Sequence, residues 1–397
     1  MTRTSRRSFL ALTGAAAASA ALAACQAPVP KRPKAKAPKE GPLALGIIGV
    51  GGRGGDNLAG VAGENIAALC DVDANNLAAA AAAFPKAALF RDYREMIAKV
   101  QLDAAVISTP DHTHAPATLA ALNAGLDVYC EKPLTHTVAE ARAVAEATEW
   151  HSAVTQMGTQ IHAGDNYRRV VELIRAGAIG RVRQAHCWVG KAWGGVERPT
   201  ETPPVPDYLD WDRWLGTAPR RPYHPIYHPA GWRSFWDFGS GTLGDMGCHH
   251  LDLPFWALGL GRPDKVSAEG PPLHAESAPA ALRVRWEYDG LDLLWHDGGM
   301  RPAQFAEGLL PEWGDGTLFV GSEGMLLADY DRHLLLPENH FVNYQRPKPT
   351  IAASVGHHKE WLDACRTRGG TTCHFGYASQ LTETVLMGVD AFRRPRG

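Results

Sequence analysis

The sequence predicts an α/β protein, with an N-terminal doubly wound parallel sheet followed by an α+β domain that holds an open, largely antiparallel sheet. Three observations predict this fold class. Short apolar runs alternate with helical segments from residue 43 to about 156, which is the pattern of parallel β-α-β units. A glycine-rich turn follows the first apolar run. Beyond residue 156, alternating polar and apolar residues predict strands with one buried face.

The first domain is expected to span residues 43–155. Its strands are predicted at 43–50, 66–70, 104–108, 127–130 and 153–156, and its helices at 77–84, 93–99, 115–124 and 138–150. Ligands of such sheets bind beyond the carboxyl ends of the strands. The segments Ser108–His114 and Glu131–Pro133 follow two of these strands, so we expect both at a binding cleft.

The second domain is expected to span residues 156–397. The pattern predicts a helix at 167–176 and strands at 182–189, 282–288, 291–295 and 317–320. Asp289 and Gly290 separate two of the strands, which predicts a hairpin there.

Composition excludes several classes of protein. With 397 residues, the chain is long enough for two domains, and its formal net charge of -2 makes nucleic acid an unfavoured partner. After the first 25 residues no apolar stretch is long enough to cross a bilayer. The seven cysteines form no CxxC pair, so no zinc-thiolate site is expected. We expect the cysteines to be buried free thiols. A disulfide between Cys365 and Cys373 is the alternative.

The N-terminus has the layout of an export signal. Residues 1–25 combine a basic start with an alanine-rich apolar stretch. Within them, Ser5–Leu10 (SRRSFL) looks like a twin-arginine signal. Leu22–Cys25 resembles a lipobox, which would make Cys25 a lipid anchor; ordinary cleavage nearby is the alternative. Residues 26–42, rich in proline and lysine, are expected to form an extended linker. The protein is therefore predicted to be periplasmic, as a free protein or a lipoprotein.

The turn after the first strand has the GxGxxG spacing of a phosphate-binding loop. Glycine lets the backbone turn sharply and approach a pyrophosphate, while the amides of the next helix point at it. The residues that we expect to hold a dinucleotide here are Gly49, Gly51, Gly52, Arg53 and Gly54.

An acid follows the second strand at the spacing expected for ribose binding. Asp71 lies 71 − 51 = 20 residues after Gly51, where a carboxylate binds the adenosine ribose hydroxyls. Since a carboxylate repels a 2′-phosphate, NAD is favoured over NADP, although Arg53 could soften that preference. Asp71 could also, or instead, be the N-cap of the next helix.

Several longer strings resemble the Gfo/Idh/MocA family of oxidoreductases. They are GIIGVGGRG, CDVD, STPDHTHAPATLAALNAGLDVYCEKPL and GTLGDMGCHHLD. Together with the leader, they are similar to exported members with a twin-arginine signal, a group of predicted dehydrogenases, and to glucose–fructose oxidoreductase. The resemblance implies a nicotinamide-dependent oxidoreductase acting on a sugar or sugar derivative, and a homo-oligomer, dimer or tetramer. Because a periplasm offers no free dinucleotide, we expect NAD to be tightly bound, with NADP as the alternative.

Three side chains are expected to carry the chemistry. By resemblance Lys132 is the catalytic lysine of the EKP motif, and Asp245 and His249 match the family's catalytic aspartate and histidine at DxxxH spacing. We expect His249 to be the general base and Asp245 to hold the substrate or orient the imidazole. If that segment is helical, residues i and i+4 share one face, and a histidine is suited to take up a proton near neutral pH. A surface ion pair with Glu131 is the alternative for Lys132. Asp252 is expected to be structural.

Other site residues are weaker candidates. We expect Thr109, Pro110, His114 and Glu131 to line the cofactor cleft, and His112 to lie on a solvated loop. Six tryptophans fall between residues 188 and 236, and of these we favour Trp232, together with Arg233, as substrate contacts. Arg220 and Arg221 could bind an acidic group or simply form ion pairs. No metal site is predicted.

Two other functions stay open at this stage. One is an NAD-dependent, redox-neutral glycoside hydrolase or lyase that works through a transient keto-sugar. The other is a binding protein for a nucleotide or sugar, which the presence of Lys132, Asp245 and His249 disfavours.

Overall fold

The structure is a computed structural model that describes residues 36–394. The predicted leader, Cys25 and most of the linker lie outside the described residues. The last part of the linker contacts the first domain, since Lys36 donates to the carbonyl of Asp103 at 2.7 Å and Lys39 forms an ion pair with the carboxylate of that residue.

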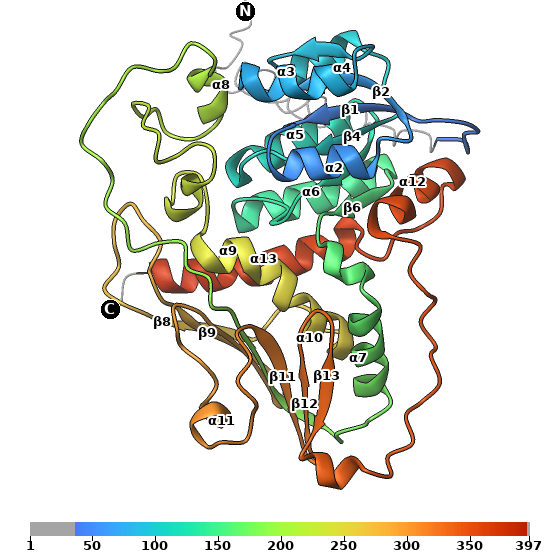
Figure 1. Cartoon of the computed structure of the whole chain (residues 1–397), viewed down its shortest axis with the longest axis vertical. Coiled ribbons are helices and arrows are strands. Elements are labelled where there is room, and N and C mark those ends of the chain that lie inside the picture. The colour runs from blue at the N-terminus through green and yellow to red at the C-terminus, as the bar shows by residue number, and fades with distance from the viewer. Residues whose placement is uncertain (1–35, 395–397) are drawn as a thin grey trace, which may run out of the picture. The chain divides into compact units, whose positions relative to one another are not determined.

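The first domain is built on a six-stranded sheet in the order β3-β2-β1-β4-β5-β6, with every neighbouring pair parallel (Figure 1). Its strands are β1 (Ala44–Ile48), β2 (Asn65–Cys70), β3 (Ala88–Phe90), β4 (Ala104–Ile107), β5 (Asp127–Cys130) and β6 (Thr155–Met157). The short strands β1, β4 and β5 are almost entirely buried, as expected of strands covered on both faces.

The helices that connect these strands are α2 (Arg53–Gly60), α3 (Ala74–Ala83), α4 (Tyr93–Lys99), α5 (Asp111–Asn123) and α6 (Val138–His151). Local side chains mark their starts. Asp73 and Asp92 accept backbone hydrogen bonds at the N-termini of α3 and α4, and Thr137 with Glu140 forms a capping box on α6. The N-cap of α3 is therefore Asp73, and the alternative reading of Asp71 as that cap is wrong.

The predicted start of α5 was four residues too late. The helix begins at Asp111 because Pro110 holds an extended conformation as the N-cap and Asp111 places a negative charge in the first turn. His112, expected on a solvated loop, is consequently buried in this helix and lies 2.9 Å from the carbonyl oxygen of Trp214.

The second domain contains a seven-stranded sheet in the order β13-β12-β11-β7-β10-β9-β8. Its strands are β7 (Val182–Trp188), β8 (Lys265–Glu269), β9 (Arg283–Tyr288), β10 (Leu291–His296), β11 (Gly316–Gly321), β12 (Met325–Ala328) and β13 (His333–Leu336). Only β7 and β10 pair in parallel; every other neighbouring pair is antiparallel. The predicted fold class is thus confirmed for both domains.

Helices and short turns complete this domain: η1 (Gln160–Ala163), α7 (Asp165–Arg175), α8 (Trp211–Leu215), η2 (Gly231–Ser234), α9 (Gly241–His250), α10 (Asp252–Leu258), α11 (Ala303–Ala306), η3 (Glu338–Phe341), α12 (His357–Thr367) and α13 (Phe375–Arg393). In residues 36–394, no helix has both the length and the apolar composition that crossing a membrane requires. All six cysteines of this part are buried and free, so the predicted thiols are confirmed there.

The end of the chain returns to the first domain. Trp361 of α12 is fully buried in the same apolar cluster as Leu45 of β1 and Leu69 of β2. Helix α13 contacts α6 and β6 of the first domain and α9, β8 and β9 of the second (Figure 1). The two domains therefore share packing at the level of α13, and this brings α9 close to the carboxyl ends of the first sheet.

The glycine loop depends on close backbone contacts. Gly49 has a φ of +81°, and a Cβ there would lie 2.6 Å from the carbonyl oxygen of Ser108. A Cβ on Gly54 would lie 2.2 Å from the carbonyl oxygen of Gly49. Since both obstacles are backbone atoms that cannot rotate away, these two glycines determine how tightly the loop turns from β1 into α2.

Substitution of Gly54 by alanine should disrupt this turn, whereas the same change at Gly55 should not. The new methyl group must displace the carbonyl of Gly49, at a cost of about 1–3 kcal/mol in unfolding free energy. At Gly55 it would lie 3.4 Å from the nearest atom, the carbonyl oxygen of Val50, and alanine favours the helix. Chemical denaturation and dinucleotide titration of both variants test this; equal behaviour would contradict it.

Candidate active site

A cavity of about 1400 Å³ opens at the carboxyl ends of β1, β2, β4 and β5 and is lined by residues of both domains. Every predicted site residue except Gly54 lines it: Gly49, Gly51, Gly52, Arg53, Asp71, Thr109, Pro110, His114, Glu131, Lys132, Trp232, Arg233, Asp245 and His249. Gly54 instead lies beneath the loop, packed on the carbonyl of Gly49. Residues separated by up to 200 positions in sequence are thus brought to one place.

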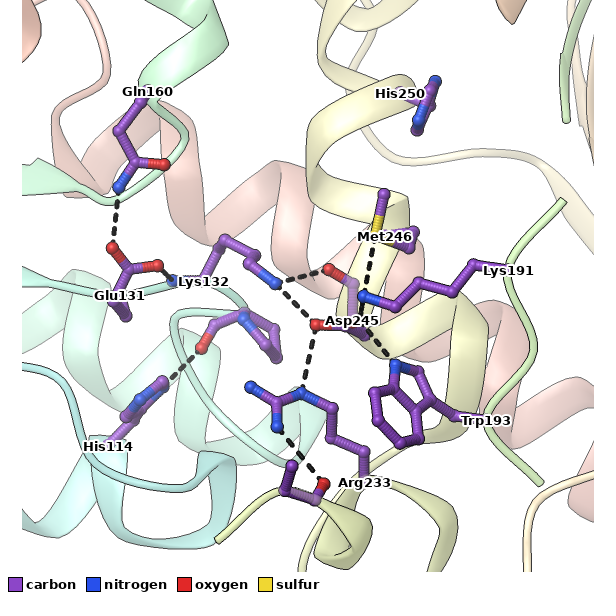
Figure 2. Close-up of polar contacts among 12 residues, drawn as sticks. His114, Glu131, Lys132, Gln160, Lys191, Trp193, Arg233, Asp245, Met246 and His250 are labelled. Atoms are coloured by element: carbon purple, nitrogen blue, oxygen red, sulfur yellow. Dashed lines mark hydrogen bonds and ion pairs between the residues drawn. The ribbon is translucent and has the colours of Figure 1, made fainter. Parts of the chain in front are cut away.

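Lys132 is held across the domain boundary. It follows β5, and its peptide bond to Pro133 is cis. Its Nζ donates to Oδ1 of Asp245 at 2.8 Å and to the carbonyl oxygen of Asp245 at 2.6 Å (Figure 2). With a side chain only 12% exposed, Lys132 is not the surface lysine of the alternative reading, and its ion pair is with Asp245, not with Glu131.

Asp245 lies in α9 and accepts hydrogen bonds from four side chains. Besides Lys132, Lys191 Nζ and Trp193 Nε1 donate to its Oδ2 at 2.7 and 2.8 Å, and Arg233 Nε donates to Oδ1 at 3.2 Å (Figure 2). Burial alone would raise the pKa of Asp245, but the charges of Lys132 and Arg233 outweigh it and hold that pKa far below its usual range. Asp245 is therefore an ionised anchor for three cations.

His249 lies one helical turn beyond Asp245, since the segment 241–250 is indeed an α-helix. Its imidazole lines the cavity, and no hydrogen-bond partner for it is found among residues 36–394. Burial, with the nearby charge of Lys132, lowers the pKa of His249 well below its usual value. The imidazole is consequently neutral near pH 7 and has a free nitrogen lone pair that can accept a proton.

The neighbours of His249 on the chain have different roles. His250 lies away from the Asp245 cluster (Figure 2), with Nε2 3.2 Å from the hydroxyl of Tyr330. Asp252 is fully buried, 2.9 Å from Nδ1 of His162, and it accepts a hydrogen bond from Tyr377 at 2.6 Å. These contacts agree with a structural role for Asp252.

Glu131 is a buried carboxylate beside the cofactor end of the cavity. Its Oε1 accepts hydrogen bonds from Asn57 at 2.9 Å and from Gln160 at 2.7 Å. Burial raises the pKa of Glu131, although the charge of Lys132 and both amide donors act in the opposite direction. Glu131 thus ties α2 and η1 to the end of β5.

His114 positions two strand ends. Its Nδ1 lies 2.7 Å from the carbonyl oxygen of Pro133, and its Nε2 lies 2.7 Å from that of Thr109. Burial lowers the pKa of His114 to about 4. Because both ring nitrogens already face backbone carbonyls, the imidazole contributes shape rather than a free polar group to the cavity.

The dinucleotide end fits the group that the sequence predicts. The carboxylate of Asp71 accepts the backbone amides of Val50 and Asp73, both at 2.9 Å, and burial raises its pKa. Any side chain at Gly49 would collide with the backbone of Ser108, so glycine is required where the loop turns toward the cavity. Oγ1 of Thr109 is buried beside the cavity and has no partner within residues 36–394. Such an orphaned hydroxyl suits a bound polar ligand.

A segment of the second domain covers this end of the cavity; we call residues 206–233 the capping segment. The amide of Ala74 donates to the carbonyl of Tyr208 at 2.8 Å, and the amide of Asp210 donates to that of Val72 at 3.0 Å. His228 Nε2 lies 3.0 Å from the carboxylate of Asp73. The capping segment is therefore bound directly to the β2–α3 turn that carries Asp71.

An aromatic core stiffens the capping segment. Trp211 stacks on Trp214 with ring centroids 4.6 Å apart, and Tyr227 packs against Phe238 at 5.3 Å. Trp193, Trp214 and Trp232 also line the cavity. The other three tryptophans of the predicted cluster, Trp188, Trp211 and Trp236, are buried in apolar packing and do not line the cavity.

The sequence did not indicate two donors to Asp245, and it left two readings open for two arginines. Lys191 and Trp193 follow β7 on a loop without a recognisable pattern, yet both contact Asp245. Arg220 forms an ion pair with Asp212, and Arg221 pairs with Asp237 and Glu276. Of the two readings of these arginines, the ion pairs are correct. Within the described part of the chain, no group of three or more His, Cys, Asp or Glu side chains could hold a metal ion.

A second carboxylate, Asp111, was also missed. It is the first residue of α5, is 4% exposed and lines the cavity, and among the described residues no side chain donates a hydrogen bond to it. Burial raises the pKa of Asp111 to about 7 in spite of the charges of Arg233 and Lys132.

The raised pKa predicts a pH-dependent stability. Asp111 should keep its proton in the folded protein up to about pH 7, while the unfolded chain loses it near pH 4. Folding stability should therefore fall as pH rises from about 4 to 7, by ~1.4 kcal/mol per pH unit, and level off above. Asp111→Asn removes this fall in stability. The melting temperature of the variant, relative to that of the wild type, should therefore increase as pH rises through this window. Exposed Asp331→Asn serves as the control; parallel curves for Asp111→Asn and wild type would contradict the assignment.

Comparison with known proteins identifies both domains. Residues 43–159 match the family model described as "Oxidoreductase family, NAD-binding Rossmann fold", and residues 179–319 match "Oxidoreductase family, C-terminal alpha/beta domain" of the same family. Inositol 2-dehydrogenase of Salmonella typhimurium is 32% identical over 153 residues, 36% of this chain and 45% of the relative. That of Rubrobacter xylanophilus is 35% identical over 143 residues, 35% and 41% of the two chains. The matches thus span less than half the length of these relatives.

Solved structures show the same fold over most of the chain. The WlbA dehydrogenase from Bordetella pertussis, in complex with NADH and UDP-GlcNAcA, has a TM-score of 0.65 at 16% identity, covering 89% of this chain and 97% of that one. GenD2 from gentamicin A biosynthesis, in complex with NAD, has a TM-score of 0.61 at 20% identity, covering 91% and 96%. The two matched models and the architecture lead to one conclusion: this chain belongs to the Gfo/Idh/MocA family of oxidoreductases.

Proposed function

We propose that the protein transfers a hydride between a tightly bound nicotinamide dinucleotide and a sugar or sugar derivative. The observation that carries this proposal is that Lys132 and His249 line the same cavity as the glycine loop and Asp71. Two sources of support come from relatives: the matched inositol dehydrogenases and the fold neighbour bound to NADH and a sugar nucleotide.

The residues that would hold the dinucleotide lie along the first domain. The amides of the glycine loop and Arg53 would receive the pyrophosphate, Asp71 the adenosine ribose, and Thr109 a polar group nearer the nicotinamide. Because Asp71 would repel a 2′-phosphate, we propose NAD over NADP. When bound, the nicotinamide supplies the hydride acceptor or donor.

The proton that leaves the substrate hydroxyl needs an acceptor, and His249 is the suitable one. Its imidazole is neutral and faces the cavity without a partner in the described chain. Lys132, fixed by Asp245, would donate a hydrogen bond to the reacting oxygen and stabilise the charge that develops there. Asp245 itself is a positioning residue, because its carboxylate already accepts four donors.

The capping segment supports the proposal that the cofactor stays bound between turnovers. Its contacts with Val72, Asp73 and Ala74 close the side of the cavity where the adenosine would lie. A cofactor held in this way would be regenerated in place, as the proposed export of the folded protein to the periplasm would require. A redox-neutral hydrolase would also regenerate it, and the test below separates the two.

Substitution of Lys132 by methionine tests the proposed chemistry. The protein is isolated with its nucleotide and mixed with a panel of sugars and glycosides, while the near-ultraviolet absorbance of reduced nicotinamide is recorded. We expect wild-type protein to reduce its bound cofactor and Lys132→Met to do so roughly 10²–10⁴ times more slowly, with unchanged nucleotide content. Exposed Lys359→Met is the matched control. Aglycone release without net reduction would instead support the hydrolase, and unchanged turnover of Lys132→Met would refute the role of the lysine.

Tight retention can be tested at the contact between His228 and Asp73. His228→Ala removes this contact from the capping segment and should speed nucleotide release roughly 3–10-fold, as expected for one partly buried polar contact. Release is measured as loss of bound nucleotide during dilution into an excess of competitor. His340→Ala, on an exposed turn far along the chain, should release at the wild-type rate. A wild-type protein that loses its nucleotide on simple gel filtration would refute tight retention.

A further inference from the structure

The side chains around Asp245 carry a surplus of positive charge. Lys132, Lys191 and Arg233 all donate to this single carboxylate, at 2.8, 2.7 and 3.2 Å. Two further carboxyl groups lie in the field of these cations. Asp111 is buried and holds its proton up to about pH 7, and Glu131, beside Lys132, accepts hydrogen bonds from Asn57 and Gln160. Three cations surround the single carboxylate of Asp245, so positive charge is in excess in this part of the cavity.

Two of these cations keep donors free for a ligand. Arg233 uses Nε for Asp245 and Nη1 for the carbonyl of Ala230, and no acceptor for its Nη2 is found in residues 36–394. Lys191 donates to Asp245 and approaches the sulfur of Met246 at 3.8 Å, and its side chain is 45% exposed. Asp245, by contrast, has no capacity left for another donor.

Aromatic rings hold both cations in place. The guanidinium of Arg233 lies 4.2 Å from the ring centroid of Trp232 and 5.6 Å from that of Trp193. The ammonium of Lys191 lies 5.3 Å from the ring of Trp193, which is itself fixed by its hydrogen bond to Asp245. Since the side chains are already ordered, little conformational entropy is lost when an anion binds to them.

These cations are not needed for the pyrophosphate of the dinucleotide. The glycine loop has its own cation, Arg53, at the start of α2, whereas Lys191 and Arg233 come from the second domain and surround α9. We propose that the sugar substrate carries an acidic group, in the first place a carboxylate, which Lys191 and Arg233 receive. This inference rests on the proposed function, in that it assigns this part of the cavity to substrate.

Matched acidic and neutral ligands test the inference. Glucuronate, glucuronamide and glucose, together with galacturonate and galactose, are titrated into the nucleotide-loaded protein, and binding is followed by tryptophan fluorescence and thermal stability. Glucuronate and galacturonate should bind roughly tenfold or more tightly than their neutral counterparts, as expected for a charge-assisted contact. Inorganic sulfate, which carries no sugar, should bind weakly at the same cations. It should therefore compete with the acidic sugars.

Lys191→Met separates the inference from general damage. It should lower the affinity for the acidic sugars and sulfate roughly tenfold, and so remove the advantage of acidic over neutral sugars, with nucleotide content unchanged. Neutral sugars that bind as well as acidic ones, or a complete lack of response to acidic sugars and sulfate, would overturn the inference. If neutral sugars reduce the cofactor and Lys191→Met does not matter, the proposed function stands and the acidic substrate falls. If acidic sugars bind through Lys191 but never reduce the cofactor, the acidic ligand of these cations stands and the proposed hydride transfer falls.

Discussion

The contact between Lys132 and Asp245 joins the two domains where the proposed chemistry takes place. Lys132 belongs to the end of β5 and Asp245 to α9, and both are largely buried. A buried ion pair adds little net stability, because both charges lose their hydration. Its value is geometric: it places the lysine ammonium against the helix that also carries His249. The packing of α13 against both domains keeps the end of β5 close to α9. The fold and the site therefore depend on the same interface.

Residues of the second domain border the cavity at both of its ends. At one end, α9 and the loop after β7 bring the donors that surround Asp245; at the other, the capping segment is hydrogen-bonded to residues 72–74. Removing water from such a space strengthens every electrostatic interaction inside it. Under the proposed function, the contacts of the capping segment with the β2–α3 turn would have to open before the adenosine end of a dinucleotide leaves. The proposed catalytic environment and the proposed retention of the cofactor would then have one structural cause.

Much of this site could be predicted from sequence because its parts follow local rules. Gly49 and Asp71 lie at fixed places relative to predicted strands, and the four-residue spacing of Asp245 and His249 puts both on one helix face. The missed residues obey no such rule. Lys191 lies on an irregular loop, and it reaches Asp245 only because the second sheet places β7 beside α9. Arg221, as basic as Arg233, turns away because Asp237 folds next to it. Which cation reaches the cavity is thus decided by tertiary neighbours.

Lys132 also helps to explain why two titratable groups on one face of α9 are both deprotonated, one as an anion and the other as a neutral imidazole. After burial, its ammonium is the main influence on both: it stabilises the carboxylate of Asp245 and opposes protonation of His249. One cation therefore keeps the anchor charged and the imidazole neutral over the same pH range. A change at Lys132 would consequently alter more than its own hydrogen bond to the substrate, because it would shift the pKa of both neighbours upward. The three residues act as one electrostatic unit, in which the lysine, together with burial, keeps the imidazole neutral and, in the proposed reaction, would also position the reacting oxygen.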